Sequence, residues 1–368
     1  MKKISIGLLL PTSSIRPMAK EFESSLKETL RVELKGIDIE FEVISEMVGS
    51  GSQPQVAKAI DNLLGYHNVD LVAGIVTRYA TESFLTKFEK RKVPFVFCNL
   101  GEQLMPVKGF NEHVIVNSIH LWQQAWLLGN YAARTFGPRG LVFSAMYDSG
   151  YGFSSMLQAG MLAANPDADL QFSLVPMPSE GELSAIQASL ELLNLDNTDF
   201  IFPLFCGEEA EVFLQQVKKK ALHKKLPILG LPFLLEFGEE EVSNIEIYTT
   251  HHDPQNHLED VQYTSVFKNL GVNLAKAIAN SLRSNGSDIN AKSLTEGFKL
   301  LNENMVYNSM ESPQITAPIS VLHNTVTNNN QIEFTIAESK VLDIDKDENA
   351  NQLRNGISAN WMNPYLGV

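Results

Sequence analysis

The residues of this chain that could do chemistry lie in two polar turns, each directly after a short apolar run. The turn Thr77-Arg78-Tyr79 follows VDLVAGIV, and the turn Asn99-Leu100-Gly101-Glu102 follows VPFVFCN. Hydroxyls, a guanidinium and the free N–H groups that begin a helix bind carboxylates, whereas a carboxylate receives an ammonium group. These residue types predict recognition of a small charged ligand.

Each charged residue of the two turns has a second interpretation. Arg78 could hold a carboxylate bidentately, or it could point to solvent or pair with a nearby acid. Glu102 could receive an ammonium group, pair with Arg78, or cap the N-terminus of a helix. The residue types alone leave these alternatives open.

The motifs of common enzyme and cofactor sites are missing from the sequence. There is no Gly-x-Ser-x-Gly elbow, no GxGxxG or GxxxxGK[ST] phosphate loop, and no evident catalytic context for Cys98 or Cys206. The adjacent His251 and His252 would point to opposite sides of an extended strand, so they cannot easily share one metal ion. We therefore expect a protein that is not an enzyme and uses neither cofactor nor metal.

The elements that must position the two turns repeat in a rhythm of short β-branched runs and longer amphipathic stretches. The runs start at Ile4, Ile37, Val69 and Val93 in one set and at Gly140, Leu170, Phe200 and Leu226 in a second. Strand–helix–strand repetition gives parallel sheets, whose ligands bind beyond the carboxyl ends of the strands. The sequence thus predicts an α/β protein of two doubly wound parallel-sheet lobes.

Three crossing segments are expected to join the lobes. They are Val116–Leu121, Ile245–Pro254 and a hairpin formed by Ile315–Asn324 and Gln331–Ser339. A long helix over Gln262–Ser284 would return to the first lobe. This divides the chain into lobe 1 (1–119 plus 252–320), lobe 2 (120–251 plus 321–342) and a polar, non-periodic tail (343–368).

Length, composition and net charge narrow the class of protein further. The 368 residues, 44% hydrophobic and 20% charged, suit a two-domain globular protein, and a net charge of −14 disfavours nucleic acid as a partner. The two cysteines are interpreted as free thiols. The start, MKKISIGLLLP, reads as a first strand rather than a leader because its apolar run is short and Pro11 ends it. The protein is then cytoplasmic, or a mature form whose leader has been removed.

The order of these elements resembles the type I periplasmic binding proteins, above all the branched-chain amino acid and amide receptors of ABC transporters. The matching stretches are ISIGLLLP, VDLVAGIV, VPFVFCN, YDSGYG and FIFPLFCGEEAEVFLQQVKKKAL. The resemblance implies two lobes that close over a small amino acid, amide or carboxylate. It implies delivery by a monomer in the periplasm or outside the cell to an ABC permease. A ligand-sensing receptor domain that regulates a partner protein is the alternative, and an α/β enzyme is a third class.

The resemblance also implies which residues touch the ligand. The turns at Thr77 and Glu102 would hold its charged head, although the family usually has a small hydroxyl residue near Arg78. Tyr151 would pack its ring on the ligand, with a core tyrosine as the alternative. Phe205, Cys206 and Phe233 would form an apolar wall of the ligand site, or they pack inside the lobe. Ser13 would lie at the rim of the site, or it caps the first helix. The family often has a tyrosine and an acid in the places of the wall, which disfavours a leucine-type ligand.

Overall fold

The computed structural model describes most of the chain, in two compact units. Unit 1 comprises Met1–His120, Thr264–Thr316 and Arg354–Val368, and unit 2 comprises Leu121–Tyr263 and Ala317–Leu353. The described residues are 2–12, 17–108, 110–145, 152–176, 184–236, 243–252, 265–286, 288–301, 305–306, 314–327 and 331–356, without the side chains of 2, 81, 184, 305 and 306. By these ranges the chain leaves unit 1 after His120 and returns to it at Thr264 and again at Arg354.

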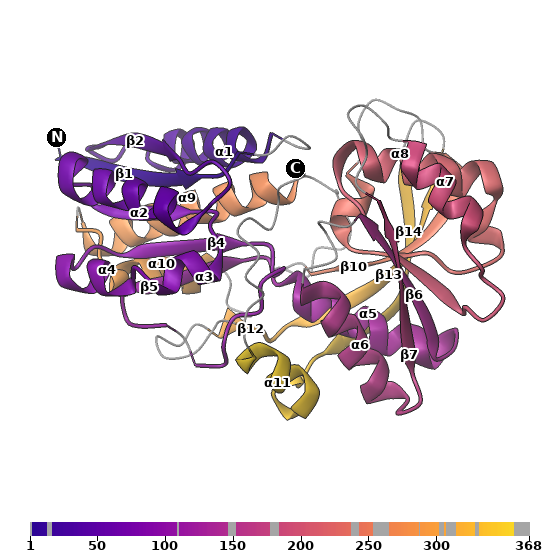
Figure 1. Ribbon diagram of the computed structural model, residues 1–368. Helices are drawn as coiled ribbons and strands as arrows, with labels where there is room; N and C mark the ends of the chain where they lie inside the picture. The colour runs from indigo at the N-terminus through magenta and orange to yellow at the C-terminus, as the bar shows by residue number, and fades with distance from the viewer. Residues whose placement is uncertain are drawn as a thin grey trace. The chain divides into compact units, whose positions relative to one another are not determined.

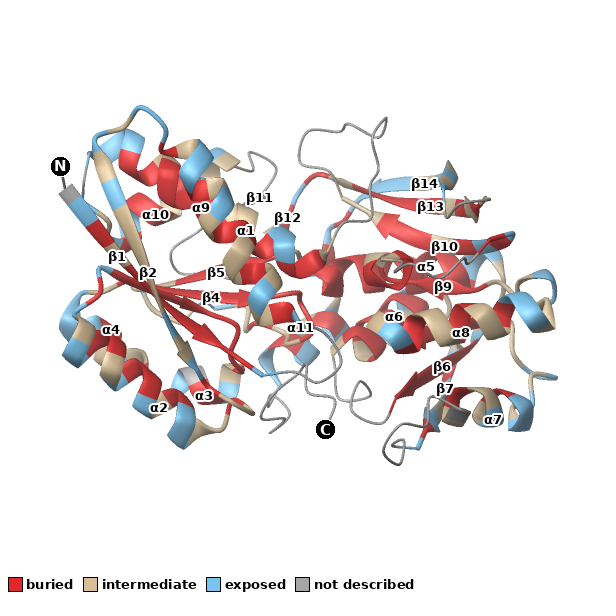
Figure 2. Cartoon of the chain, turned by 90° about the horizontal axis from the view of Figure 1, so that it is seen from above, coloured by how far each residue is buried: buried red, intermediate tan, exposed pale blue. Residues whose placement is uncertain are grey.

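Unit 1 contains a five-stranded parallel sheet in the order β2-β1-β3-β4-β5 (Figure 1). The strands are β1 Lys2–Leu10, β2 Ile39–Met47, β3 Leu71–Gly74, β4 Phe95–Asn99 and β5 Val114–Ser118. Strands β3 and β4 are buried along their whole length, which is why their sequences read as continuous apolar runs. Figure 2 shows β4 in red. The parallel order confirms the predicted doubly wound arrangement, and β1 confirms that the first apolar run is a strand.

The helices of unit 1 pack on this sheet and on each other. They are α1 Met18–Glu33, α2 Gln53–Asp61 with a π-helical turn Asn62–His67, α3 Arg78–Glu82, α4 Leu85–Arg91, α9 Val266–Asn285 and α10 Ala291–Leu301. Unit 1 also has a short strand pair, β11 Met305–Val306 and β12 Gln314–Ile315. Helix α1 has an apolar stripe at four-residue spacing, which is buried at Phe22, Leu26 and Leu30. Gly271 of α9 lets the two helices approach, because a Cβ there would overlap the Phe22 carbonyl oxygen. Helix α9 therefore returns to unit 1, as the sequence predicts.

Unit 2 combines parallel and antiparallel pairing. One sheet has the order β7-β6-β8 and is parallel, and the other has the order β14-β13-β10-β9. The strands are β6 Arg139–Ala145, β7 Asp169–Val175, β8 Phe200–Leu204, β9 Leu229–Gly230, β10 Ile245–His251, β13 Pro318–Val326 and β14 Ile332–Val341. Strands β13 and β14 form the predicted hairpin, and a hairpin pairs only antiparallel. The hairpin thus extends a doubly wound unit with antiparallel strands.

The helices of unit 2 are α5 Leu121–Thr135, α6 Gly152–Ala164, α7 Ser184–Leu192 and α8 Gly207–Lys220. Helices α5 and α6 are in close contact at two glycines. A Cβ at Gly129 would overlap the Leu157 carbonyl oxygen, and a Cβ at Gly160 would overlap the Trp126 carbonyl oxygen. The two backbones therefore approach at a distance that excludes any side chain at these positions.

The segment predicted as a non-periodic tail contains ordered helix, which corrects that prediction. A 3-10 turn over Ile344–Lys346 leads into α11, Glu348–Asn355. The indole nitrogen of Trp126 donates to an Asp347 carboxylate oxygen at 2.6 Å, and the other oxygen of Asp347 accepts from the Ala350 N–H at 3.0 Å. A distant tryptophan and a helix cap order this segment, and neither produces a periodic apolar pattern.

The substitution Gly160→Ala tests the close approach of α5 and α6. The added methyl group must displace backbone, so we expect a loss of roughly 1–3 kcal/mol in the free energy of unfolding. Urea unfolding followed by circular dichroism measures it. Gly65→Ala is the matched control, because nothing lies within 4 Å of a Cβ at that position. Equal unfolding midpoints for the two variants would contradict the packing described.

Candidate functional site

The carboxyl ends of three neighbouring strands in unit 1 bring the two predicted polar turns together. Strand β4 pairs with β3 on one side and with β5 on the other, and Asn99 stands opposite Ser118 in the register. Thr77 follows β3, and Glu102 follows β4. In a parallel sheet this is the edge at which ligands bind.

Asn99 organises the turn after β4. Its side chain is fully buried, and its carbonyl oxygen accepts from the Gly101 N–H at 2.7 Å and from the Ser118 hydroxyl at 2.9 Å. Gly101 has φ of 101°, a conformation that favours glycine. The Asn99 amide nitrogen has no hydrogen-bond acceptor among the described residues. Neither Asn99 nor Ser118 is among the ligand contacts predicted from the sequence, although each ends a strand.

Glu102 is held by its own turn. The side chain is buried, and its carboxyl oxygens accept from the Leu100 N–H at 2.8 Å and from the Gln103 side-chain nitrogen at 3.4 Å. Leu100 is itself buried. Glu102 thus brings a hydrogen-bond acceptor to the edge of the sheet and uses one backbone N–H that an anion would otherwise meet.

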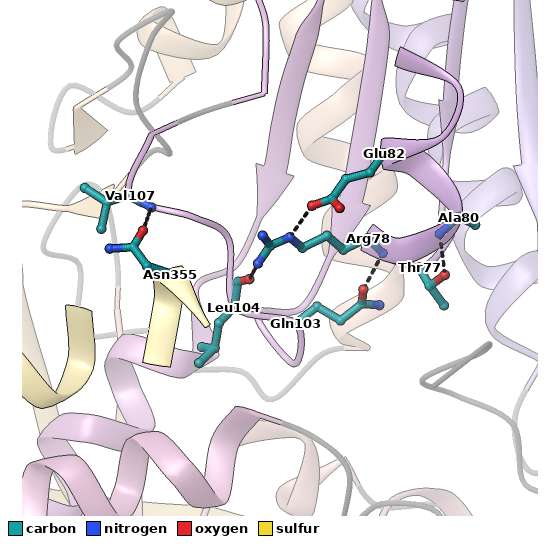
Figure 3. Close-up of polar contacts among 8 residues, drawn as sticks. All are labelled: Thr77, Arg78, Ala80, Glu82, Gln103, Leu104, Val107 and Asn355. Atoms are coloured by element: carbon teal, nitrogen blue, oxygen red, sulfur yellow. Dashed lines mark hydrogen bonds and ion pairs between the residues drawn. The ribbon is translucent and has the colours of Figure 1, made fainter. Parts of the chain in front are cut away.

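Arg78 follows the alternative in which it pairs with a nearby acid, and that acid is Glu82 (Figure 3). Its Nε donates to Glu82 Oε1 at 2.7 Å, one turn further along α3, and its Nη1 donates to the Leu104 carbonyl oxygen at 2.9 Å. The Arg78 backbone N–H donates to the Gln103 side chain. These contacts hold the turn after β4 against the start of α3, so in this structure Arg78 stabilises the two turns.

The two residues beside Arg78 differ in exposure. Thr77 is buried, and its hydroxyl accepts from the Ala80 N–H at 3.2 Å, which caps the first turn of α3. Tyr79 is 44% exposed. Thr77 thus caps α3 in this structure, whereas Tyr79 is exposed at the surface of unit 1.

The candidates of unit 2 lie after β8 and β9. Phe205 is fully buried, with its ring 5.3 Å from that of Phe143 and 5.4 Å from that of Phe213, so it belongs to the core of the unit. Cys206 is half-buried at the N-cap of α8. Phe233 is buried in a 3-10 turn over Pro232–Leu235, 6.1 Å from the Phe153 ring. Ser13 and Tyr151 lie outside the described residues.

Both cysteines are free, as the sequence analysis expects. Cys98 is buried within β4, and this burial raises the pKa of its thiol to about 12, against the smaller opposing effect of the Asn117 amide. The Asn117 side chain donates to the Cys98 sulfur at 3.5 Å. A thiol with such a pKa carries almost no thiolate at neutral pH, so Cys98 is a poor nucleophile.

Thiol titration tests this assignment. In the folded protein at pH 8 we expect 5,5′-dithiobis(2-nitrobenzoate) to react with Cys206 alone, because thiolate formation at Cys98 is suppressed. Unfolding in guanidinium chloride should release the second thiol. Cys206→Ser should remove the reaction of the folded protein, while Cys98→Ser should leave it. A fast reaction that survives Cys206→Ser would refute the assignment.

The described residues contain neither a membrane-spanning helix nor a cluster of metal ligands. None of the described helices combines the length and the apolar character needed to cross a membrane. Within the same parts of the chain, no three histidine, cysteine, aspartate or glutamate side chains are grouped so that they could hold a metal ion.

Comparison with known proteins finds likeness at the level of structure. No protein-family model matches the chain, and no curated protein matches its sequence. A substrate-binding protein of an ABC transporter from Sphaerobacter thermophilus superposes with a TM-score of 0.68 at 16% identity, over 92% of this chain and 98% of that one. A solute-binding protein of an ABC transporter from Rhodopseudomonas palustris BisB5 was solved with 3,4-dihydroxybenzoic acid. It gives a TM-score of 0.65 at 13% identity, over 94% of this chain and 99% of that one.

A leucine-binding protein, LivK, from Thermotoga maritima gives a TM-score of 0.58 at 16% identity, over 93% of this chain and 99% of that one. Identities this low establish the fold and leave the ligand open. The nearly complete coverage of both chains shows that the likeness extends over both units. The chain therefore has the two-lobe α/β fold of the type I periplasmic binding proteins.

Proposed function

We propose that this protein is a solute-binding protein that holds a small polar ligand at the carboxyl ends of its parallel strands and delivers it to an ABC permease. The observation that carries the proposal is the meeting of two polar turns at one edge of the unit 1 sheet. The ABC transporter proteins that share the fold support it. In this role the protein acts as a monomer in the periplasm or outside the cell, and it is not an enzyme.

The polar groups at that edge support a ligand with both a donor and an acceptor. The Glu102 carboxyl group offers acceptor oxygens, and the Asn99 amide nitrogen offers a donor that no described residue uses. The Arg78 guanidinium is already bonded to Glu82 and to a carbonyl oxygen. We therefore favour amino acids and amides, followed by small carboxylates. Tyr79, Tyr151, Cys206 and Phe233 remain proposed contacts to the body of the ligand, and Ser13 a proposed contact at the rim.

A thermal-shift screen tests the ligand class. The panel contains the protein amino acids, their amides, benzoate, 4-hydroxybenzoate and 3,4-dihydroxybenzoate. A true ligand at a hundred times its Kd stabilises the folded state by about 2.7 kcal/mol, which raises the melting temperature measurably. If no compound of this panel raises the melting temperature, the proposal fails for this ligand class.

Variants at the site test its position. For an amino acid or amide ligand, Glu102→Gln should weaken binding about tenfold, because a charge-assisted hydrogen bond is lost. Tyr151→Ala should weaken it as well. Calorimetric titration measures both effects. Glu28→Gln, which neutralises an exposed carboxylate of α1, is the matched control. Unchanged affinity in both site variants would place the ligand elsewhere.

A further inference from the structure

Strand β7 is an outermost strand of unit 2, and two of its apolar side chains lie at the surface. It pairs with β6 on one side, and no described strand pairs with its other side. Phe172 is 50% exposed and Leu174 is 43% exposed. Val142 of β6, the partner of Phe172 in the register, is fully buried. The apolar face that is buried at β6 therefore becomes exposed at β7.

The main-chain groups that β7 presents to the outside belong to the same residues. The Asp169 N–H donates to the Pro138 carbonyl oxygen at 2.9 Å, so the odd-numbered residues of β7 bond toward β6. Successive residues of a strand direct their main-chain groups to alternate sides. Leu170, Phe172 and Leu174 therefore direct their N–H and C=O groups away from the sheet. An added strand would pair with these three residues, whose side chains also share one face.

The edge of β7 lacks the charges that stand on other open edges of this chain. The outermost strands β2 and β14 carry three charged residues each, which are Glu40, Glu42 and Glu46 on β2 and Glu333, Glu338 and Lys340 on β14. Charged residues on an edge strand prevent pairing with another sheet. The only charged residue of β7 is Asp169, at its start, and it is followed by LQFSLV. The edges of β2 and β14 are thus protected against pairing, whereas the edge of β7 is not.

We propose that two copies of this chain associate through β7, edge to edge and antiparallel, about a two-fold axis at Phe172. In this register Phe172 pairs with the partner's Phe172, and Leu170 pairs with the partner's Leu174. Residues that pair in this way exchange both of their N–H···O bonds, which fits the outward direction of these main-chain groups. The two strands then join the β7-β6-β8 sheets of both copies into one sheet.

Strand β7 is complementary to itself in this register. An antiparallel partner must bring apolar side chains to the face of Phe172 and polar side chains to the opposite face, and β7 has this alternation. Asp169 lies opposite the partner's Val175, so the two carboxylates do not meet. Pro176, directly after the strand, has no N–H and ends the pairing. A second copy therefore supplies the main-chain groups, the alternation and the neutral charge that this edge requires.

The pairing is closed and weak. A two-fold contact uses the same strand of both copies, so the association stops at two. The net charge of −14 on each copy opposes association, and salt screens this repulsion. A contact along one strand edge is small, and small interfaces are transient. The monomer that we propose for delivery is thus the form at low concentration, and the pairing goes beyond that role.

Sedimentation equilibrium of the full chain tests the pairing. Between about 1 and about 300 μM protein, we expect the weight-average mass to rise from that of a monomer toward that of a dimer. The rise should be larger at high salt, because the repulsion between the acidic copies is screened. A mass that stays monomeric, grows past the dimer or falls with added salt would overturn the proposal.

A charge on the edge locates the contact. Phe172→Lys should abolish the rise in mass, because it brings two cations together across the pair. Ile336→Lys is the matched control, since Ile336 lies on the outermost strand β14 and is 49% exposed. Association that ignores Phe172→Lys would place the contact elsewhere and overturn the proposal. The ligand-induced thermal shift should persist in Phe172→Lys, so this proposal and the proposed function can fail separately.

Disulfide trapping tests the register, with Cys206→Ser in every variant to remove the native thiol that we expect to react. A mixture of Gln171→Cys and Ser173→Cys proteins should form a disulfide-linked dimer under oxidation, because these positions face each other across the pair. Each variant alone should stay unlinked, because its equal positions lie diagonally, about 7–8 Å apart, beyond the usual reach of a disulfide. A non-reducing gel measures both. An unlinked mixture, or equal linking in the single variants, would overturn the proposed pairing.

Discussion

Parallel strand pairing in unit 1 is the constraint on which the rest of this structure depends. Parallel strands require crossover connections, and in this unit most of these connections are helices that cover the sheet and bury its central strands. The same pairing carries every carboxyl end to one edge, so the turns that begin with Thr77 and Asn99 become neighbours. The position of the candidate site therefore follows from the order and direction of the strands, and the side chains set its chemistry. The same strand order makes β2 the outermost strand, and no described strand pairs with its outer side.

The polar groups at the strand ends form hydrogen bonds with one another, and these bonds determine which polar atoms remain for a ligand. Asn99 bonds to Ser118, and Arg78 bonds to Leu104 and Glu82. Such bonds hold the turns in place at no cost to a ligand that arrives later, which is the physical content of preorganisation. They also occupy the Nε and Nη1 atoms of the Arg78 guanidinium.

Much of the fold could be predicted because its signals are local. The apolar stripe of α1, the strands of both units and the β13–β14 hairpin each follow from the spacing of hydrophobic residues within a short window. Helix α11 was missed because its anchor, the bond between Trp126 and Asp347, joins residues far apart in the chain.

The sequence by itself determined the alternation of strands and helices and the residue types that stand where strands end. Tertiary structure alone decided that Phe205 packs between Phe143 and Phe213 in the core of unit 2. It also decided that β7 lies at the edge of its sheet with Phe172 exposed. The reason is physical: periodicity and turn chemistry are properties of neighbours along the chain. Burial and pairing depend on partners that only the folded chain brings together.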